Sequence, residues 1–323
     1  MRSTVGPRHG LLAAAVVAFL ALPVGAQAAT FSVNSIGTGS DVTIDGSCDT
    51  DATADTDCGL RAAIEEANST TASDTIVFQS TASPSDPDDV EFDLASNRVI
   101  GGTLPTITHA LIINGDDCQP APDLPATPCL RLNTQIGINS DGEVNIRGLA
   151  FSGAGTAIDV IHVTGTSPGA PDFVLNGSWF GLDPTGAVQS PPDTAILLED
   201  VDGAQIGGST RGERNLFARQ GTGVDVLGAD GTQIRGNWFG IKPDGTFART
   251  GEGSAANGDA IEITGNSTPN PDNQATNTKI GLASSFSATP ECDGFCNLIA
   301  GAGRTGAGGA AAGSAIDLGG DGG

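Results

Sequence analysis

The chain has 323 residues, of which 47 are glycine, and it carries a formal net charge of −24. Glycine stands at about twice its average frequency without a Gly-X-Y period, which excludes a collagen-like protein. With 38 acidic and 14 basic residues, the charge excludes nucleic acid and anionic membranes as partners, because both are recognised through clustered Lys and Arg. Aromatic residues make up only 4% of the chain, so we expect an aliphatic core in many short strands with tight turns.

The N-terminus has the three-part layout of a secretory signal peptide. Two arginines precede an apolar run from Leu11 to Leu22, and Ala26-Gln27-Ala28 is a typical cleavage site. The sequence therefore predicts a signal peptide over residues 1–28 and a secreted or cell-surface protein, whose net charge after cleavage is −26. The alternative is an uncleaved anchor helix, but an apolar run of about a dozen residues is short for a helix that spans a bilayer. No second long apolar run follows, so we expect no membrane insertion after signal removal.

The six cysteines fall into three local pairs, Cys48/Cys58, Cys118/Cys129 and Cys292/Cys296. In an exported protein, local pairs of this kind predict disulfides that staple loops. A zinc site is the less favoured alternative, because no pair has C-x-x-C spacing and the histidines stand apart from the cysteines.

An amphipathic helix is predicted near the N-terminus, over residues 57–68. Its apolar residues follow the i, i+3, i+4, i+7 spacing: Leu60, Ala63, Ile64 and Ala67. Asp57 or Thr56 can cap its start and Asn68 can end it. A strand over residues 74–78 follows. We expect this helix to lie across the open apolar end of the strands that come after it.

Short strand motifs repeat along the rest of the chain. One series pairs a small residue with two aliphatics, at residues 157–160, 195–198, 223–226, 260–263 and 315–318, and a second is centred on Ile146, Leu175, Ile206, Ile234 and Ile280. The stretch 178–186 recurs as 237–245, so two coils of about 30 residues make one superperiod. Repeats of short strands predict a solenoid whose coils stack through backbone hydrogen bonds. The fold class is therefore all-β, a parallel β-helix, and a β-sandwich is the alternative.

The N-terminal motif resembles a known family. Phe31–Ser35, Cys48, Cys58–Ile64 and Ala67-Asn68 are similar to the CSLREA domain, which stands at the start of bacterial secreted proteins. Two positions depart from that motif, because Gly59 stands where Ser is usual and Ala62 where Glu is usual. Later stretches such as 206–216 and 236–240 look like the coils of right-handed parallel β-helix repeat proteins.

The resemblance implies an exported, often cell-surface β-helix protein and no established reaction. It divides the chain into the signal peptide at 1–28, a CSLREA-like cap region at 29–100 and right-handed β-helix repeats at 101–323. The last strand is followed only by a glycine-rich tail, so we expect an uncapped apolar end and further C-terminal domains in a longer chain.

Four acidic residues occupy the variable position of the first strand series: Asp159, Asp225, Glu262 and Asp317, with Leu197 as the fifth member. Strand alternation points them outward, in one column with about 4.8 Å between coils. Such a column predicts a calcium-assisted or sugar-binding stripe, since hard cations take carboxylate oxygens. The alternative is a solvated face without a ligand.

A second acidic segment also looks like a calcium loop, with aspartates at positions 45, 49, 51, 55 and 57. It lacks the glycine and the closing glutamate of an EF-hand, and Leu60 stands near the closing position. An acidic loop tied by Cys48 and Cys58 is the favoured interpretation.

Two tryptophans, Trp179 and Trp238, precede the inward Phe180 and Phe239 in the matched strands. Alternation places both indoles on the outer surface, two coils and about 10 Å apart, where they could stack on sugar rings. The alternative is that each packs beneath a neighbouring loop, such as 243–258.

No catalytic motif is recognisable in the sequence. The Gly-His-Gly and Arg-x-Lys elements of polygalacturonase-like β-helix enzymes are absent, and His109 and His162 stand in apolar contexts typical of structural histidines. The sequence therefore predicts a surface scaffold or adhesion module that binds polysaccharide or a cell-surface glycan. The alternative is a polysaccharide lyase or glycoside hydrolase of the parallel β-helix type, which fold analogy alone supports.

Overall fold

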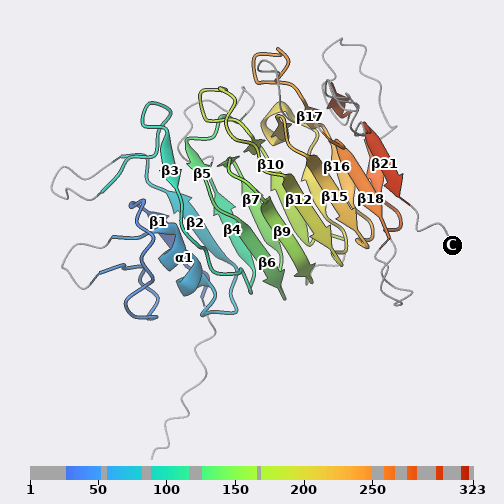
Figure 1. Cartoon of the computed structure of the whole chain (residues 1–323). Helices are drawn as coiled ribbons and strands as arrows, with labels where there is room; N and C mark the ends of the chain where they lie inside the picture. Colours follow the sequence, from blue (N-terminus) through green and yellow to red (C-terminus); the bar gives the residue numbers. More distant parts are fainter. Residues whose placement is uncertain are drawn as a thin grey trace, which may run out of the picture.

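The computed structural model describes residues 27–51, 57–81, 89–115, 126–165, 169–248, 258–265, 275–281, 296–300 and 314–319. In these ranges the secondary structure is almost entirely β, in three parallel sheets. Figure 1 shows their strands side by side along one stack, from α1 and β1 at the N-terminal end to β21 at the other. The all-β class predicted from the sequence is confirmed.

The first sheet has eight strands in the order β1 (Thr30–Val33), β2 (Asp74–Phe78), β4 (Leu111–Asn114), β7 (Val144–Arg147), β10 (Phe173–Asn176), β13 (Gln205–Gly207), β16 (Gln233–Arg235) and β19 (Lys279–Ile280). The second sheet has seven, β3 (Arg98–Ile100), β5 (Leu130–Leu132), β8 (Ala150–Phe151), β11 (Trp179–Phe180), β14 (Leu216–Phe217), β17 (Trp238–Phe239) and β20 (Leu298–Ile299). The third sheet has six, β6 (Ile136–Ser140), β9 (Thr156–Val163), β12 (Thr194–Glu199), β15 (Thr222–Leu227), β18 (Ile261–Thr264) and β21 (Ile316–Gly319).

The chain visits the three sheets in a fixed order. From β4 onward it passes through the first, the second and the third sheet and then returns to the first, and we call one such passage a circuit. Each strand pairs in parallel with the strand at the same place in the next circuit, as β9 does with β12 and β12 with β15. The strand series predicted at residues 157–318 lies in the third sheet, and the series centred on residues 146–280 lies in the first sheet.

The core follows from strand alternation. In β4, β7 and β10 buried and half-buried residues alternate, so each strand turns one row of aliphatic side chains inward. In the second sheet the inward row is a stack of parallel phenyl rings, in which the centroids of Phe151, Phe180, Phe217 and Phe239 are 4.9, 4.9 and 4.5 Å apart. The predicted inward orientation of Phe180 and Phe239 is confirmed.

Glycine fixes the corner after these strands. Gly181 and Gly240 follow the matched Trp-Phe pairs and have φ angles of 72° and 73°, in the left-handed region. A Cβ at Gly181 would lie 2.1 Å from the carbonyl oxygen of Ala218 in the next circuit, so no other residue fits there. The two matched Trp-Phe motifs lie two circuits apart, because their strands β11 and β17 pair with opposite sides of β14.

The predicted amphipathic helix is α1 (Leu60–Ala67), and its apolar residues are buried in the main core. Its start differs from the prediction, because the N-cap is Gly59 and no side chain caps it. Gly59 is still extended and bridges to Ser35, so the helix begins later than the sequence suggested. A Cβ at Gly59 would lie 2.6 Å from the carbonyl oxygen of Gly37, which gives a physical reason for glycine at this position.

Two consecutive glutamates of α1 hold the loop that leads to it. Glu65 accepts a hydrogen bond from the backbone N–H of Asp41, at 2.7 Å. Glu66 accepts from the N–H groups of Asp45 and Gly46, each at 2.9 Å, although Glu66 itself is fully buried. Burial raises the pKa of Glu66, and its backbone donors oppose that shift.

The stack is continuous across the predicted boundary at residue 100. In the first sheet, β2 pairs with β1 on one side and with β4 on the other. At the opposite end, β21 pairs only with β18 among the described strands, and Leu318 on it is 71% exposed. A single 3-10 turn, η2 (Arg211–Glu213), joins β13 to β14 in the described part.

Candidate functional site

The predicted acidic column lies in one row across the third sheet. Cα pairing joins Asp159 to Leu197, Leu197 to Asp225, Asp225 to Glu262 and Glu262 to Asp317. From β9 to β15 the residues on either side of this row, such as Val224 and Val226, are fully buried, whereas the row itself is half-buried; at the end of the stack, in β21, Asp317 and both its neighbours are exposed. The row therefore faces outward, as strand alternation predicts, and Leu197 separates the first acid from the other three.

Neighbouring carboxylates in this row perturb each other. The pKa of Asp225 is raised to about 6, first by burial and then by the negative charges of Glu262 and Glu199. The pKa of Glu262 is raised by burial and by Asp259 and Asp317. Asp225 therefore holds a proton in the range where most carboxyl groups are ionised, and it can donate as well as accept a hydrogen bond there.

At the N-terminal end of the row, Asp159 has an amide neighbour in place of a second carboxyl group. Burial raises the pKa of Asp159, and the amide of Gln135 opposes the shift by donating a hydrogen bond at 3.1 Å to its Oδ2. Aliphatic side chains share the same face of the sheet. Ile161, two residues after Asp159, is 45% exposed, and Leu227, two residues after Asp225, is half-buried. The face thus combines carboxyl groups with small apolar areas.

The acidic segments do not form a recognisable metal centre in the described ranges. No group of three or more His, Cys, Asp or Glu side chains there is placed to hold a metal ion. In the N-terminal acidic loop, Asp49 and Asp45 instead accept backbone N–H groups two residues ahead of them, and Asp55 lies outside the described residues. Calcium binding by either acidic segment therefore stays a prediction from the sequence.

The disulfide between Cys48 and Cys58 is present and ties this loop to the start of α1. Cys129 and Cys296 are disulfide-bonded as well. Their predicted partners, Cys118 and Cys292, lie outside the described residues.

The prediction of two exposed indoles is wrong for Trp179, which is 2% exposed. It belongs to a second apolar cluster outside the main core, with Leu182, Leu216, Ala218 and Ala248 among its members. Both tryptophans lie outside the main core, and residues that follow the two Trp-Phe strands, Leu182 and Ala248, pack in the same cluster as Trp179. For Trp179 the alternative, in which neighbouring loops cover the indole, is therefore the arrangement found.

Trp238 is half-buried, and its ring is already occupied. The guanidinium carbon of Arg214 lies 4.1 Å from the ring centre, in cation–π geometry. The loops after the two Trp-Phe strands close through antiparallel bridges, between Leu182 and Val188 and between Ile241 and Phe247. Trp179 presents no free face for a sugar and Arg214 lies over one face of Trp238, so both tryptophans take part in packing.

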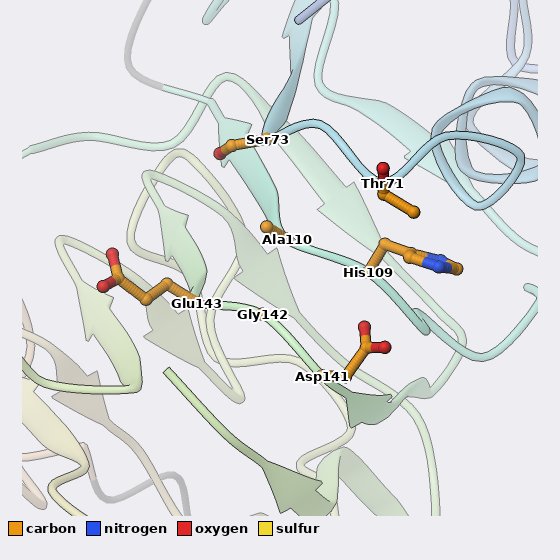
Figure 2. A pocket seen from close by; sticks show the side chains of 7 residues that line it. All are labelled: Thr71, Ser73, His109, Ala110, Asp141, Gly142 and Glu143. Atoms are coloured by element: carbon orange, nitrogen blue, oxygen red, sulfur yellow. The ribbon is translucent and has the colours of Figure 1, made fainter. Parts of the chain in front are cut away.

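A hollow of about 320 Å³ lies at the corner between the third and the first sheet. It is lined in three successive circuits, by Thr71 and Ser73 before β2, His109 before β4, and Asp141, Gly142 and Glu143 before β7. Glycine at 142 allows the corner to pack closely, since a Cβ there would lie 2.6 Å from that of Ala110. Figure 2 shows the imidazole of His109 and the carboxylate of Asp141 on one side, and the side chain of Glu143 on the other, pointing away from both.

The sequence did not single out this hollow. His109 was interpreted as structural, because its neighbours are apolar, whereas the structure places its half-exposed ring at the hollow. The one available signal was that Ser73, Ala110 and Glu143 each stand directly before a strand of the same sheet. His162 lies elsewhere, in β9, and is half-buried.

The predicted signal peptide, residues 1–28, falls almost wholly outside the described residues. None of the helices in the described part is long and apolar enough to cross a membrane. Comparison of the chain with protein-family models, with curated proteins and with solved structures gives no match.

Proposed function

We propose that the chain is a right-handed parallel β-helix with a CSLREA-like N-terminal cap. The fixed order of the three sheets and the parallel pairing of successive circuits support a helical path for the chain. Parallel crossover connections are right-handed in about 98% of cases, which supports the hand. The position of α1 at the N-terminal end, with its apolar residues in the core, supports the role of a cap.

On this scaffold, the outer face of the third sheet is a recognition surface for a glycan, and the protein acts as an exported surface or adhesion module. The observation that carries the proposal is the outward row of Asp159, Asp225, Glu262 and Asp317, set among the aliphatic Leu197 and Leu227. Carboxylate oxygens accept hydrogen bonds from sugar hydroxyl groups. Small apolar areas between them contact the C–H faces of the rings, as is common in ligand sites.

Charge selects the class of glycan. The chain carries a net charge of −24, and three of its carboxyl groups lie on neighbouring strands of the row, Asp225, Glu262 and Asp317. A polyuronate would meet repulsion along the whole row, because like charges on neighbouring groups disfavour association. The partner proposed is therefore a neutral polysaccharide, in an extended form that follows the row from one strand to the next.

Export is part of the proposal. The N-terminal sequence supports a signal peptide, and the Cys48–Cys58 disulfide is compatible with an oxidising compartment outside the cytoplasm.

Binding of soluble polysaccharides tests the proposal. Laminarin, xylan, mannan and polygalacturonate are titrated into the purified chain and followed by calorimetry. We expect one or more of the three neutral chains to bind, and binding to weaken about tenfold in Asp225→Asn and Glu262→Gln, since hydrogen bonds to charged groups are worth about 1.5–3 kcal/mol. Asp244→Asn is the matched control, because Asp244 is an exposed carboxylate on the loop after β17. Absence of binding to all three neutral chains, or equal binding by all variants, contradicts the proposal.

The enzymatic alternative has one specific observation in its favour. Asp225, with its raised pKa of about 6, lies on the strand next to Glu262, and acid–base cleavage of a glycoside needs one protonated and one ionised carboxyl group. Incubation with the same polysaccharides distinguishes the two functions. New reducing ends or unsaturated products that disappear in Asp225→Asn identify a hydrolase or lyase, whereas binding without products identifies a scaffold.

A further inference from the structure

The loop over residues 41–46, which we call the cap loop, is attached to α1 through hydrogen bonds rather than through apolar packing. Its two aliphatic side chains, Val42 and Ile44, are each 52% exposed, so burial of apolar surface does little to hold it. Three of its backbone N–H groups instead donate to Glu65 and Glu66 of α1, at 2.7 to 2.9 Å. The position of the cap loop therefore depends on these carboxyl groups.

A second carboxyl group lies next to Glu66. The side chain of Asp41 is within hydrogen-bond reach of Glu66, and its own two oxygens accept the backbone N–H groups of Asp49, at 2.7 Å, and Thr43, at 3.0 Å. Glu66 is fully buried. Two carboxylates in contact repel each other, and burial strengthens the repulsion because water screens it less. The pair therefore needs either a proton between its oxygen atoms or a bound cation.

The hydrogen bonds around the pair favour the proton. All four oxygens of Glu66 and Asp41 accept a backbone N–H, whose positive end points to where a cation would have to bind. Side chains suited to a metal ion do not come together in a group of three anywhere in the described ranges. A protonated carboxyl group, in contrast, donates a short and strong hydrogen bond to a neighbouring carboxylate.

The other charged groups near the pair leave its charge uncompensated. Arg61 of α1 contacts Glu65, at 3.0 Å, and donates to two oxygens of neighbouring loops. α1 packs against β1, which carries no charged residue, and against β2, whose Asp74 accepts two hydrogen bonds of its own. Asp45 and Asp49 add negative charge in and after the cap loop. The one positive charge among these groups is thus paired with Glu65.

We propose that Glu66 and Asp41 form a pH-sensitive switch that attaches the cap loop to α1. With a proton on Glu66, its O–H donates to Asp41 and the loop is held; without the proton, the two carboxylates repel each other and the loop opens. The disulfide between Cys48 and Cys58 fixes the chain just after the loop and confines the opening to the residues before it. This switch is separate from the third sheet and does not depend on the proposed function.

The direction of the pH dependence follows from Glu66. Burial raises the pKa of Glu66 above its ordinary value of 4.5, its backbone donors oppose the shift, and the charge of Asp41 adds to it. The stability that such a group contributes is present in full below pH 4.5 and is lost as the pH rises through the folded-state pKa. The loop should therefore be closed in acid, and its opening equilibrium should rise by up to about tenfold per pH unit above that pKa.

Amide hydrogen exchange measures the opening directly. Protection of the N–H groups of Asp45 and Gly46, corrected for the intrinsic pH dependence of exchange, is followed by NMR from about pH 4 to about pH 8 in the presence of a chelator. We expect protection in the wild type to fall as the pH rises. It should stay nearly constant in Asp41→Asn and in Glu66→Gln, because in each variant an amide donates in place of the proton.

Asp45→Asn is the matched control, since it removes an acid from the same loop and keeps both the pair and the N–H donors. It should retain the pH dependence of the wild type. The N–H of Asn68, which donates to the carbonyl of Ile64 at the end of α1, should stay protected throughout and shows that the helix is folded.

Four results would overturn the inference. The first two are wild-type protection that does not change with pH and an equal pH dependence in Asp41→Asn. The third is a parallel loss of protection at Asn68, which would mean unfolding of the whole cap. The fourth is recovery of protection at about pH 8 on addition of calcium chloride, because a cation rather than a proton would then join the pair.

Discussion

The side-chain amide of Asn215 donates a hydrogen bond to Oδ1 of Asn237 in the next circuit, at 3.1 Å, and both residues are fully buried. The same amide also donates to the carbonyl of Leu175, at 2.9 Å. Asn237 repeats the arrangement one circuit on, with bonds to the carbonyl of Ile206 and to Oδ1 of Asn297. Asparagines at one corner thus satisfy backbone carbonyls that the turn between the first and second sheets leaves without partners.

Replacement of Asn237 should therefore destabilise the whole stack. Asn237→Ala removes the donor to the carbonyl of Ile206 and the acceptor for the backbone N–H and the side-chain amide of Asn215. The amide of Asn215 keeps its bond to the carbonyl of Leu175, but the buried N–H of Asn215 and the carbonyl of Ile206 each lose a partner. We expect the free energy of unfolding to fall by about 2–4 kcal/mol, since each unsatisfied buried group costs about 1–3 kcal/mol. Urea denaturation followed by circular dichroism measures the change.

Asn139→Ala is the control for this prediction. Asn139 is exposed in β6, and its side chain makes no hydrogen bond to the other described residues. Its replacement should change the unfolding free energy by less than about 0.5 kcal/mol. Equal losses in the two variants would mean that the buried asparagines contribute nothing particular to the corner.

The phenyl stack gives a second prediction. Phe217 is fully buried, with its ring centroid 4.9 Å from that of Phe180 and 4.5 Å from that of Phe239. Phe217→Ala opens a cavity in the middle of the stack, and it should cost about 3–5 kcal/mol. Phe247→Ala is the matched control, because that ring is 62% exposed. Thermal denaturation of both variants checks the difference, and a cost below about 1 kcal/mol for Phe217→Ala would contradict it.

The acidic row gives a prediction about pH. The pKa of Asp225 is about 6 in the folded chain against an ordinary value of 3.8, so the folded state holds the proton more tightly than the unfolded chain. The stability that this carboxyl group contributes is present in full below pH 3.8 and is lost as the pH rises to about 6. Asp225→Asn should therefore gain stability relative to wild type between pH 4 and pH 7. Because the group is partly exposed, we expect a gain of at most about 1 kcal/mol. Melting temperatures at the two pH values measure it.

Leu197→Asp tests the same electrostatics in the opposite direction. The substitution puts a carboxyl group between Asp159 and Asp225, where the natural row is interrupted. The variant should be less stable than Leu197→Asn at pH 7, and the difference should shrink at pH 4, where Asp225, with its pKa of about 6, holds its proton. A difference between them that does not depend on pH would refute repulsion within the row.

The strand patterns were enough to predict much of the fold. The small-aliphatic-variable-aliphatic motif placed β9, β12, β15, β18 and β21 in one series, because inward aliphatics must alternate with outward side chains in a strand. The spacing of apolar residues likewise predicted α1, although not its first residue. Its start was decided by the bridge between Gly59 and Ser35, a contact between segments that the local pattern does not contain.

Exposure and sites were harder to predict from local pattern. Alternation correctly turned Trp179 away from the main core, but it could not show that the following loop and Ala218 and Ala248 cover the indole. The hollow was missed for the same reason, since residues 71, 109 and 141 come together only when three circuits are stacked.

The repeat period, the strands and the acidic outward row can be predicted from local sequence, because they follow from the geometry of one strand and the charges of its own residues. Glycine content, the feature most evident in the composition, is explained by corners such as Gly181, where a neighbouring circuit leaves no space for a Cβ. The stacking of the circuits, in contrast, sets which outward groups remain exposed, which carboxyl group has a raised pKa and where a hollow forms. These properties depend on distances between circuits, and those distances are set by packing rather than by any single segment.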